Sequence, residues 1–169
     1  MPFSSRLHRF SDGAYCSELN GQTTSWKWEQ EQTDNQPFNY LVIEPSTFDH
    51  EPALVLSLSA TITDDRITEL LGSDINIWHV TIPSPHNDFL KTRSQTRAFR
   101  ELLRELLEKI KAKHGHNATL HVFPAMPVAL AVEFGRVLMP KADMPIKIYD
   151  ENRKLRGFTF ALDLGTVKQ

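Results

Sequence analysis

The sequence predicts an α/β fold in which a mostly parallel β-sheet lies between layers of helices. Strand-like and helix-like segments alternate from residue 53 onward, in the order that builds a doubly wound sheet. The first strand-like segment, "ALVLSLSATI" at 53–62, is almost continuously apolar, as is typical of strands covered on both faces. The chain has 169 residues, of which 40% are hydrophobic and 24% are charged, as in one ordinary soluble domain. We therefore expect a single core built around this sheet.

Local patterns predict the elements that follow the first strand. Residues 64–72 predict a short helix closed by a glycine, and 75–83 predict a second strand that ends at a proline. A third strand is predicted at 118–123, followed by a helix rich in small residues. Two further strands are predicted at 146–150 and 157–164. The turn-like "ENRKLR" between them predicts an antiparallel hairpin at one edge of the sheet.

The longest predicted helix follows the polar loop "SPHNDFLK". Thr92 and Gln95 have the spacing of a capping box, and lysines precede Gly115 at the other end. One face of this helix is apolar and is expected to pack on the sheet. That face consists of Phe99, Leu102, Leu103, Leu106, Leu107 and Ile110. The opposite face carries Glu105 and Lys109 at helical spacing, which indicates a solvated surface.

The first 52 residues differ from the rest, because they are polar and their apolar residues occur in short clusters. The alternation of Trp26 and Trp28 and the β-rich run 38–43 predict two short strands, paired as a hairpin around "EQTDNQ". We therefore expect a polar β arm at 1–52 beside a domain at 53–169. The aromatic residues of the arm could stack on nucleic-acid bases, although aromatic residues more often pin a hairpin to its sheet.

Charge and composition exclude several classes of partner. The formal net charge of −2 and the pI near 6.4 give no bulk attraction to nucleic acid or to an anionic membrane. The one cysteine, Cys16, cannot form an internal disulfide. Neither a membrane-spanning run nor a signal peptide is evident, so we expect a cytoplasmic location.

The sequence carries no signature that predicts catalysis, a cofactor or a metal. It has no Gly-rich dinucleotide motif, no Walker loop and no nucleophile elbow. His114, His116 and His121 are close in sequence, but a helix-ending glycine and a strand separate them, so we expect surface and packing roles. Asp64 and Asp65 could bind magnesium, but they are explained more simply as negative charge at a helix N-terminus.

Two loops are the candidate ligand site. In open α/β sheets, ligands bind at the carboxyl ends of the strands, where the direction of the topology reverses. The loop "SLSAT" ends the first strand and offers the hydroxyl groups of Ser57, Ser59 and Thr61 to a sugar or phosphate. The loop "FPAMP" at 123–127 ends the third strand. We expect the two loops to converge.

The prolines of the second loop suggest how a helix N-terminus could meet the ligand. Pro127 is predicted as the first helical residue, and Pro124 is expected to hold the turn extended. Val128 and Ala129 then open the helix with small side chains, so their free N–H groups could approach a phosphate closely. The alternative interpretation remains open, because strand-end hydroxyls often satisfy only backbone groups and proline is common at helix starts.

These segments resemble a known family. "ALVLSLSATI", "FRELLRELLEKI", "LHVFPAMPVALAVEFGRVLMPKADMPIKIYDEN" and "FTFALDL" are together similar to the C-terminal half of a SAVED domain, the cyclic-oligonucleotide sensor fused to effectors in bacterial anti-phage systems. The resemblance covers roughly residues 53 to 164. It implies a Rossmann-like fold related to the CARF domains of CRISPR ancillary proteins. It also implies binding of a cyclic di-, tri- or tetranucleotide that activates an attached effector, without catalysis by the sensor.

The resemblance also implies site residues. The matching positions include the two loops, and Tyr149 and Asp150 at the end of the fourth strand, which could border the pocket. The complete set of implied ligand-binding residues is Ser57, Ser59, Thr61, Phe123, Pro124, Ala125, Met126, Pro127, Tyr149 and Asp150. Gly135 and Arg136 match too, in the middle of a helix, where packing and an internal ion pair are alternative roles. His86 and Asn87 follow the second strand and could read a base.

One departure from the family affects the expected assembly. A full SAVED domain resembles two fused CARF-like units with the ligand between them, whereas this chain has room for one. We therefore expect the chain to pair with itself or with a second such unit, and to bind weakly until the site is closed. Three functions remain open: a sensor subunit with an effector partner, a ring-nuclease-like enzyme, or an assembly subunit that binds no ligand.

Overall fold

The structure is a computed structural model that describes residues 28, 29, 38–152, 154 and 157–165, and the backbone of three short strands before them. Those strands, β1 (His8–Arg9), β2 (Tyr15–Leu19) and β3 (Gln22–Ser25), form an antiparallel sheet of their own. Trp28 belongs to no strand and Trp26 lies outside the described residues.

A six-stranded sheet forms the centre of the fold, in the order β4-β6-β5-β7-β8-β9. The inner strands β6, β5, β7 and β8 are parallel to one another, and the edge strands β4 and β9 are antiparallel to their neighbours. The bounds are β4 (Leu41–Ile43), β5 (Glu51–Ser57), β6 (Ile75–Thr81), β7 (Leu120–Ala125), β8 (Ile146–Asn152) and β9 (Gly157–Asp163). The protein is thus a mixed α/β fold, and the predicted β8–β9 hairpin is confirmed.

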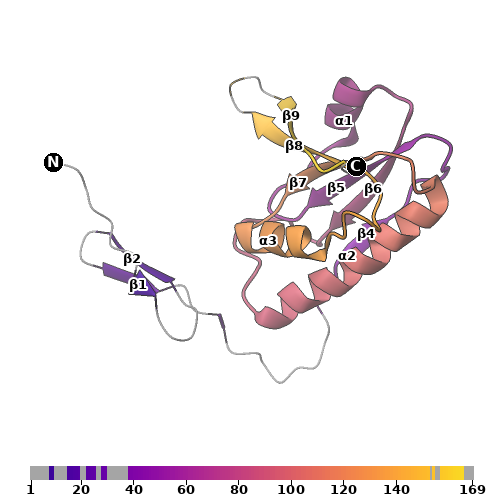
Figure 1. Cartoon of the computed structure of the whole chain (residues 1–169). Helices are drawn as coiled ribbons and strands as arrows, with labels where there is room; N and C mark the ends of the chain where they lie inside the picture. The colour runs from indigo at the N-terminus through magenta and orange to yellow at the C-terminus, as the bar shows by residue number, and fades with distance from the viewer. Residues whose placement is uncertain are drawn as a thin grey trace.

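Helices cover both faces of this sheet. Helix α1 (Asp64–Leu71) lies on one face, and α2 (Arg93–His114) and α3 (Val128–Val137) lie side by side on the other (Figure 1). The chain runs from β5 outward to β6 and then returns past β5 to β7 and β8. Because each parallel crossover is right-handed, this reversal of direction places α1 opposite α2 and α3.

The sheet therefore has a core on each side. The larger core lies under α2 and α3 and is built on the fully buried side chains of Trp78, Phe99 and Leu54. The smaller core lies under α1. It comprises Ala53, Val55, Ile62, Ile67, Phe123, Tyr149 and Phe158. In the described part of the chain, no helix is both long enough and apolar enough to cross a bilayer.

The structure differs from the expected layout of the first 52 residues where it describes them. Leu41–Ile43 form β4, which pairs antiparallel with β6, whereas Trp26 and "EQTDNQ" of the predicted hairpin lie outside the described residues. The position expected for a domain boundary, after residue 52, falls inside β5, and β4 before it belongs to the same six-stranded sheet. In both cases the pairing is between segments distant in the chain, which a local pattern does not reveal.

The helix ends mostly follow their predicted signals. Thr92 and Gln95 form the predicted capping box at the start of α2, and Gly115 ends the helix with a φ of 89°. Pro127 is the N-cap of α3, with an extended backbone, and not its first helical residue as predicted. Pro124 lies within β7, beyond the last residue that pairs with β8, so its missing N–H removes no hydrogen bond from that pairing.

Candidate functional site

The candidate site lies where the chain reverses direction across the sheet. β5 lies between β6 and β7, and the parallel strands end at Ser57, Thr81 and Ala125, which are in register with one another. The loops that follow these strands therefore start from the same edge of the sheet. This is the position at which open α/β sheets bind ligands.

Hydrogen bonds hold the three loops together. The carbonyl oxygen of Ala125 accepts from the N–H groups of Leu58 at 2.9 Å and Ser59 at 2.7 Å. The carbonyl oxygen of Leu58 in turn accepts from the N–H of His86 at 3.1 Å. The hydroxyl of Thr81 donates to the carbonyl of Ser57 at 3.0 Å. The loops after β5, β6 and β7 are thereby fixed relative to one another.

The three predicted hydroxyl residues of the β5 loop lie in different environments. Ser57 is buried, and its Oγ accepts from the N–H of Ile62 at 3.1 Å, so this side chain shapes the loop. Ser59 is partly exposed and Thr61 is exposed. Ser59 and Thr61 are therefore the two hydroxyl groups that a ligand at this edge could reach.

The second loop brings the start of α3 to the same edge. Pro127 has no side-chain hydrogen bond as an N-cap, and its carbonyl accepts from the N–H groups of Leu130 and Ala131. Within the described residues, no acceptor pairs with the N–H of Val128 or of Ala129. Free N–H groups and the helix dipole favour an anion at this position. Contact of a phosphate with them stays a prediction.

Few charges lie in the described loops at this edge. Residues 58–63, 82–87 and 126–127 contain no lysine or arginine, and Lys91, farther along the loop after β6, is paired with Asp88. Neutral donors are therefore the nearest groups to a phosphate at Ser59 and Thr61. His86 is exposed, and its Nδ1 lies 2.7 Å from the carbonyl oxygen of Ser84. Because the backbone of His86 is bonded to Leu58, the structure brings this predicted base reader to the β5 loop.

Other predicted site residues lie away from this edge. Phe123 is fully buried and stacks on Tyr149, with ring centroids 4.7 Å apart. The hydroxyl of Tyr149 lies 2.8 Å from Nδ1 of His121, inside the core under α1. Asp150 is exposed and accepts from the N–H of Glu151. Any contact of these residues with a ligand stays a prediction.

Two polar features were missed by sequence reasoning. The first is Thr81, whose hydroxyl joins β6 to β5; the sequence signal was a polar residue at the end of an apolar strand. The second is a chain of three groups in which His121 lies between the hydroxyl of Tyr149 and the carboxylate of Glu51, at 2.8 and 3.1 Å. Its members are 28 and 70 residues from His121, so no local spacing could reveal it.

Acidic and histidine residues do not gather into a metal site among the described residues, where no group of three or more has suitable geometry. Asp64 and Asp65 occupy the first turn of α1, as predicted. Asp64 Oδ1 lies 2.9 Å from Nε2 of His79 on β6. A carboxylate beside an imidazole can serve proton transfer. Asp64 of this pair lies three residues after Thr61 in the sequence.

Two grooves in the described surface lie beside the candidate site rather than in it. A polar groove of about 610 Å³ runs along β6 past His79 and Asp64, and an apolar groove of about 380 Å³ lies between α3 and the β8–β9 hairpin. Ser59 and Thr61 line neither groove. The candidate site is therefore part of neither groove, and its two accessible hydroxyl groups lie at the surface, Ser59 partly exposed and Thr61 exposed.

The comparisons with known proteins follow this geometry. Residues 14–164 match the family model described as "SMODS-associated and fused to various effectors sensor domain", SAVED. No curated protein sequence matches the chain.

Solved structures with a similar fold include the Acinetobacter baumannii Cap4 SAVED/CARF-domain containing receptor. With the cyclic trinucleotide 2'3'3'-cAAA it has a TM-score of 0.57 and 19% identity, over 87% of this chain and 31% of that one. With 3'3'3'-cAAA it has a TM-score of 0.57 and 20% identity, over 88% and 32%. This chain thus spans about a third of the length of those receptors, and at this identity the likeness is one of fold.

Proposed function

Because the chain belongs to the SAVED family of sensor domains, we propose that it binds a cyclic oligonucleotide and signals to an effector in bacterial anti-phage defence. The observation that carries the proposal is the convergence of three loops at the carboxyl edge of a Rossmann-like sheet. Ser59, Thr61 and the free N–H groups of α3 supply neutral donors there. A cyclic oligonucleotide offers two kinds of acceptor that such donors can bind, namely phosphate oxygens and sugar hydroxyls.

The two Acinetobacter receptor structures support this class of ligand, since each contains a cyclic trinucleotide. In this chain Ser59 is partly exposed and Thr61 is exposed. A ligand bound there would keep one face in water, and a second unit would have to cover that face. We therefore propose that the chain provides half of a composite site and that pairing strengthens binding. We also propose that the unit is not catalytic.

Substitution of Ser59, one of the two accessible hydroxyl residues, tests the site. Ser59→Trp places a bulky side chain on the surface where the ligand would lie, so binding of a cyclic trinucleotide measured by calorimetry should be lost. Ser73→Trp is the matched control, because Ser73 is exposed and follows the C-terminal end of α1, whereas Ser59 precedes the N-terminal end of that helix. Equal binding by the two variants would contradict the proposed site.

The pair of Asp64 and His79 favours a second candidate, an enzyme that cleaves the same messengers. The imidazole could accept a proton from a ribose 2'-hydroxyl that attacks the neighbouring phosphate, with the carboxylate orienting the ring. A cyclic phosphate would form, the bond from phosphorus to the 5'-oxygen would break, and the imidazolium would return the proton to that leaving oxygen. Incubation of a cyclic trinucleotide with the protein separates the two functions. Linear product that disappears in His79→Ala would support the enzyme, and intact ligand recovered from the complex would support the sensor.

A further inference from the structure

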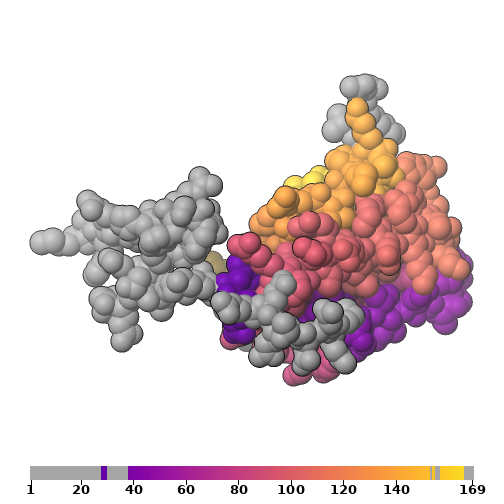
Figure 2. Space-filling view, turned by 90° about the horizontal axis from the view of Figure 1, so that it is seen from below, coloured from indigo at the N-terminus to yellow at the C-terminus, as the bar shows by residue number. Residues whose placement is uncertain are grey.

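Arginine side chains form a stripe along the side of helix α2 that faces α3. At about 3.6 residues per turn, positions 93, 97, 100 and 104 fall within roughly 60° of arc around a helix axis. In α2 these positions are Arg93, Arg97, Arg100 and Arg104. Figure 2 shows α2 at the surface beside α3, so the stripe follows the junction of the two helices.

The two later arginines of the stripe are neutralised by carboxylates from the side of α3. Arg100 donates from Nε to the carboxylate of Glu133 at 2.8 Å, and Glu133 is a buried residue of α3. Arg104 donates to both carboxylate oxygens of Asp143, in the loop that follows α3. These contacts fix which side of α2 faces α3, and they give both cations a partner.

The two earlier arginines have no such partner. Arg93 and Arg97 are exposed, and no ion pair or hydrogen bond joins either side chain to another described residue. Helix α3 begins with the apolar run "VALAV" at 128–132, so it offers no carboxylate before Glu133. In the described part of the chain, both positive charges are therefore left without a counter-charge.

The position of these two charges is unfavourable for the helix itself. Arg93 and Arg97 lie in the first two turns of α2, whose first turn contains no acidic residue. A positive charge opposes the dipole at a helix N-terminus, and like charges four residues apart repel each other. Folding thus gains nothing from the two cations. Such a local conflict with stability is typical of residues that serve binding.

The unpaired arginines lie toward the candidate site. Helix α2 follows the loop after β6, and this loop is bonded to the β5 loop through the N–H of His86 and the carbonyl of Leu58. Helix α3 follows the β7 loop at the same edge of the sheet. Both helices run away from this edge (Figure 1), so the unpaired arginines are near it and the paired ones are farther away.

We infer that Arg93 and Arg97 bind a phosphate group of the cyclic oligonucleotide. The inference rests on the proposed function, and it supplies the positive charge that the β5 and β7 loops lack. A guanidinium group presents its N–H donors as a fork that matches the oxygens of a phosphate. Residues four apart are neighbours on a helix surface, so both side chains can approach one phosphate. The bound ring would extend from Ser59 and Thr61 toward the junction of α2 and α3.

Calorimetry with a panel of cyclic di-, tri- and tetranucleotides, repeated over a range of salt concentrations, tests the assignment. For the member that binds, Arg93→Gln and Arg97→Gln should each raise the dissociation constant about tenfold. The loss of affinity with rising salt should also become less steep, because one fewer charge on the protein neutralises the phosphate. Lys141→Gln is the matched control, since Lys141 is exposed and follows α3 at the opposite edge of the sheet.

The outcomes separate this inference from the proposed function. If the unmodified chain binds a member of the panel, and the arginine variants match Lys141→Gln in affinity and salt dependence, the inference is wrong and the proposed function stands. If the unmodified chain binds no member, the proposed function fails and the inference fails with it.

The stability of the ligand-free chain gives a second measurement. At low salt, Arg93→Gln and Arg97→Gln should each raise the thermal midpoint, because each removes a charge that opposes the dipole of α2. Lys141→Gln should leave the midpoint nearly unchanged. A lower midpoint in the arginine variants would show that both cations have partners within the protein, and would overturn the inference.

Discussion

At the scale of the residue, His114 joins two elements through both of its ring nitrogens. Its Nε2 accepts from the indole N–H of Trp78 at 3.1 Å, and its Nδ1 lies 2.9 Å from the carbonyl oxygen of His50. Because the indole can only donate, Nε2 must carry the lone pair and Nδ1 the proton. Both contacts therefore require a neutral ring.

Protonation of His114 should destabilise the fold. Burial lowers the pKa of His114 below its usual value of 6.5, and the bond to His50 opposes this only in part. The unfolded chain then takes up the proton first as the pH falls, so the free energy of unfolding should decrease below about pH 6.5. Urea denaturation over a pH series should show this, with a weaker dependence for His114→Gln. An identical pH dependence for the two proteins would contradict the assignment.

Arg104 and Asp143 form an ion pair that connects α2 to the loop between α3 and β8. Asp143 is buried, and its carboxylate accepts two bonds from Arg104 and one from the N–H of Met139. Burial alone would raise the pKa of Asp143, but the bonds from Arg104 and Met139 outweigh it, so the pKa is lowered.

Removal of Arg104 should leave the buried carboxylate of Asp143 without its charged partner. Arg104→Met is expected to lower the free energy of unfolding by about 3–5 kcal/mol. The double variant Arg104→Met with Asp143→Leu should recover much of that loss, because no buried charge remains. Chemical denaturation of the two variants measures the difference, and a double variant as unstable as the single one would refute this account.

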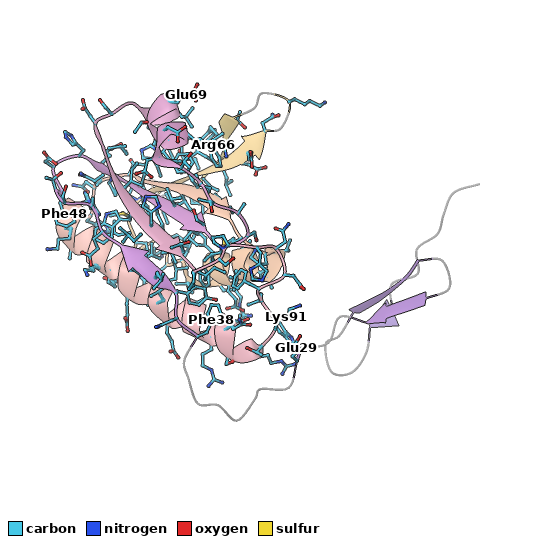
Figure 3. All side chains as sticks on the ribbon, turned by 180° about the vertical axis from the view of Figure 1, so that it is seen from behind. Glu29, Phe38, Phe48, Arg66, Glu69 and Lys91 are labelled. Atoms are coloured by element: carbon cyan, nitrogen blue, oxygen red, sulfur yellow. The ribbon has the colours of Figure 1, made fainter. Side chains whose placement is uncertain are left out.

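At the scale of the element, Gln95 of α2 fixes the loop that follows β6. Its Oε1 accepts from the N–H groups of Lys91 at 2.6 Å and Thr92 at 2.9 Å, and its Nε2 donates to the carbonyl of Phe89 at 3.0 Å. At the end of this loop, just before α2, the carbonyl of Lys91 accepts a hydrogen bond from the N–H of Glu29 (Figure 3). The same loop carries His86 to the candidate site.

Loss of the Gln95 side chain should loosen that loop. Gln95→Ala leaves buried backbone groups without partners, at an expected loss of about 1–3 kcal/mol in the free energy of unfolding. Gln95→Glu keeps the two accepting bonds but sets a carboxylate oxygen against the carbonyl of Phe89, so it should also be less stable while the N–H groups of Lys91 and Thr92 stay bonded. Hydrogen exchange should report faster exchange at Lys91 and Thr92 in Gln95→Ala only. Equal exchange in both variants would argue against this role.

The sequence predicted the elements well where a local pattern decides them. Continuous apolarity indicated β5, helical spacing and a capping box indicated α2, and a short turn indicated the β8–β9 hairpin. It did not predict that β4 pairs with β6, because such pairing depends on contacts between distant segments.

The position of the candidate site could be predicted from the topology of the sheet. The side chains that are exposed there could not. The rule for parallel sheets was sufficient to predict that the loops after β5 and β7 converge, and the bonds from Leu58 and Ser59 to Ala125 bear this out. Which side chains reach the surface was not predictable. Ser57 turns inward to the N–H of Ile62, and Phe123 is covered by α1. A strand that is apolar on both faces does not reveal in its sequence which side chains point into which core.

At the scale of the whole molecule, the net charge gives no general attraction for anions, so an anionic ligand would have to be held by a local site. The formal net charge is −2, and about half of the cations in the described part of the chain, Lys91 and Arg100 among them, are held in ion pairs. One example is Arg66, which bonds Glu151 and lies over the ring of Phe158 beside the hairpin (Figure 3). Under the proposed function, binding of a cyclic oligonucleotide would depend on the geometry of the converging loops rather than on bulk charge.

The most direct test of the central claim is thermal unfolding of the unmodified chain with a panel of cyclic di-, tri- and tetranucleotides. A ligand that binds only the folded state raises its stability, by about 2.7 kcal/mol at a hundredfold excess over the dissociation constant. The account predicts that one member of the panel raises the midpoint and that Ser59→Trp abolishes the shift. No shift with any member up to saturating concentration, or the same shift in Ser59→Trp, would contradict it.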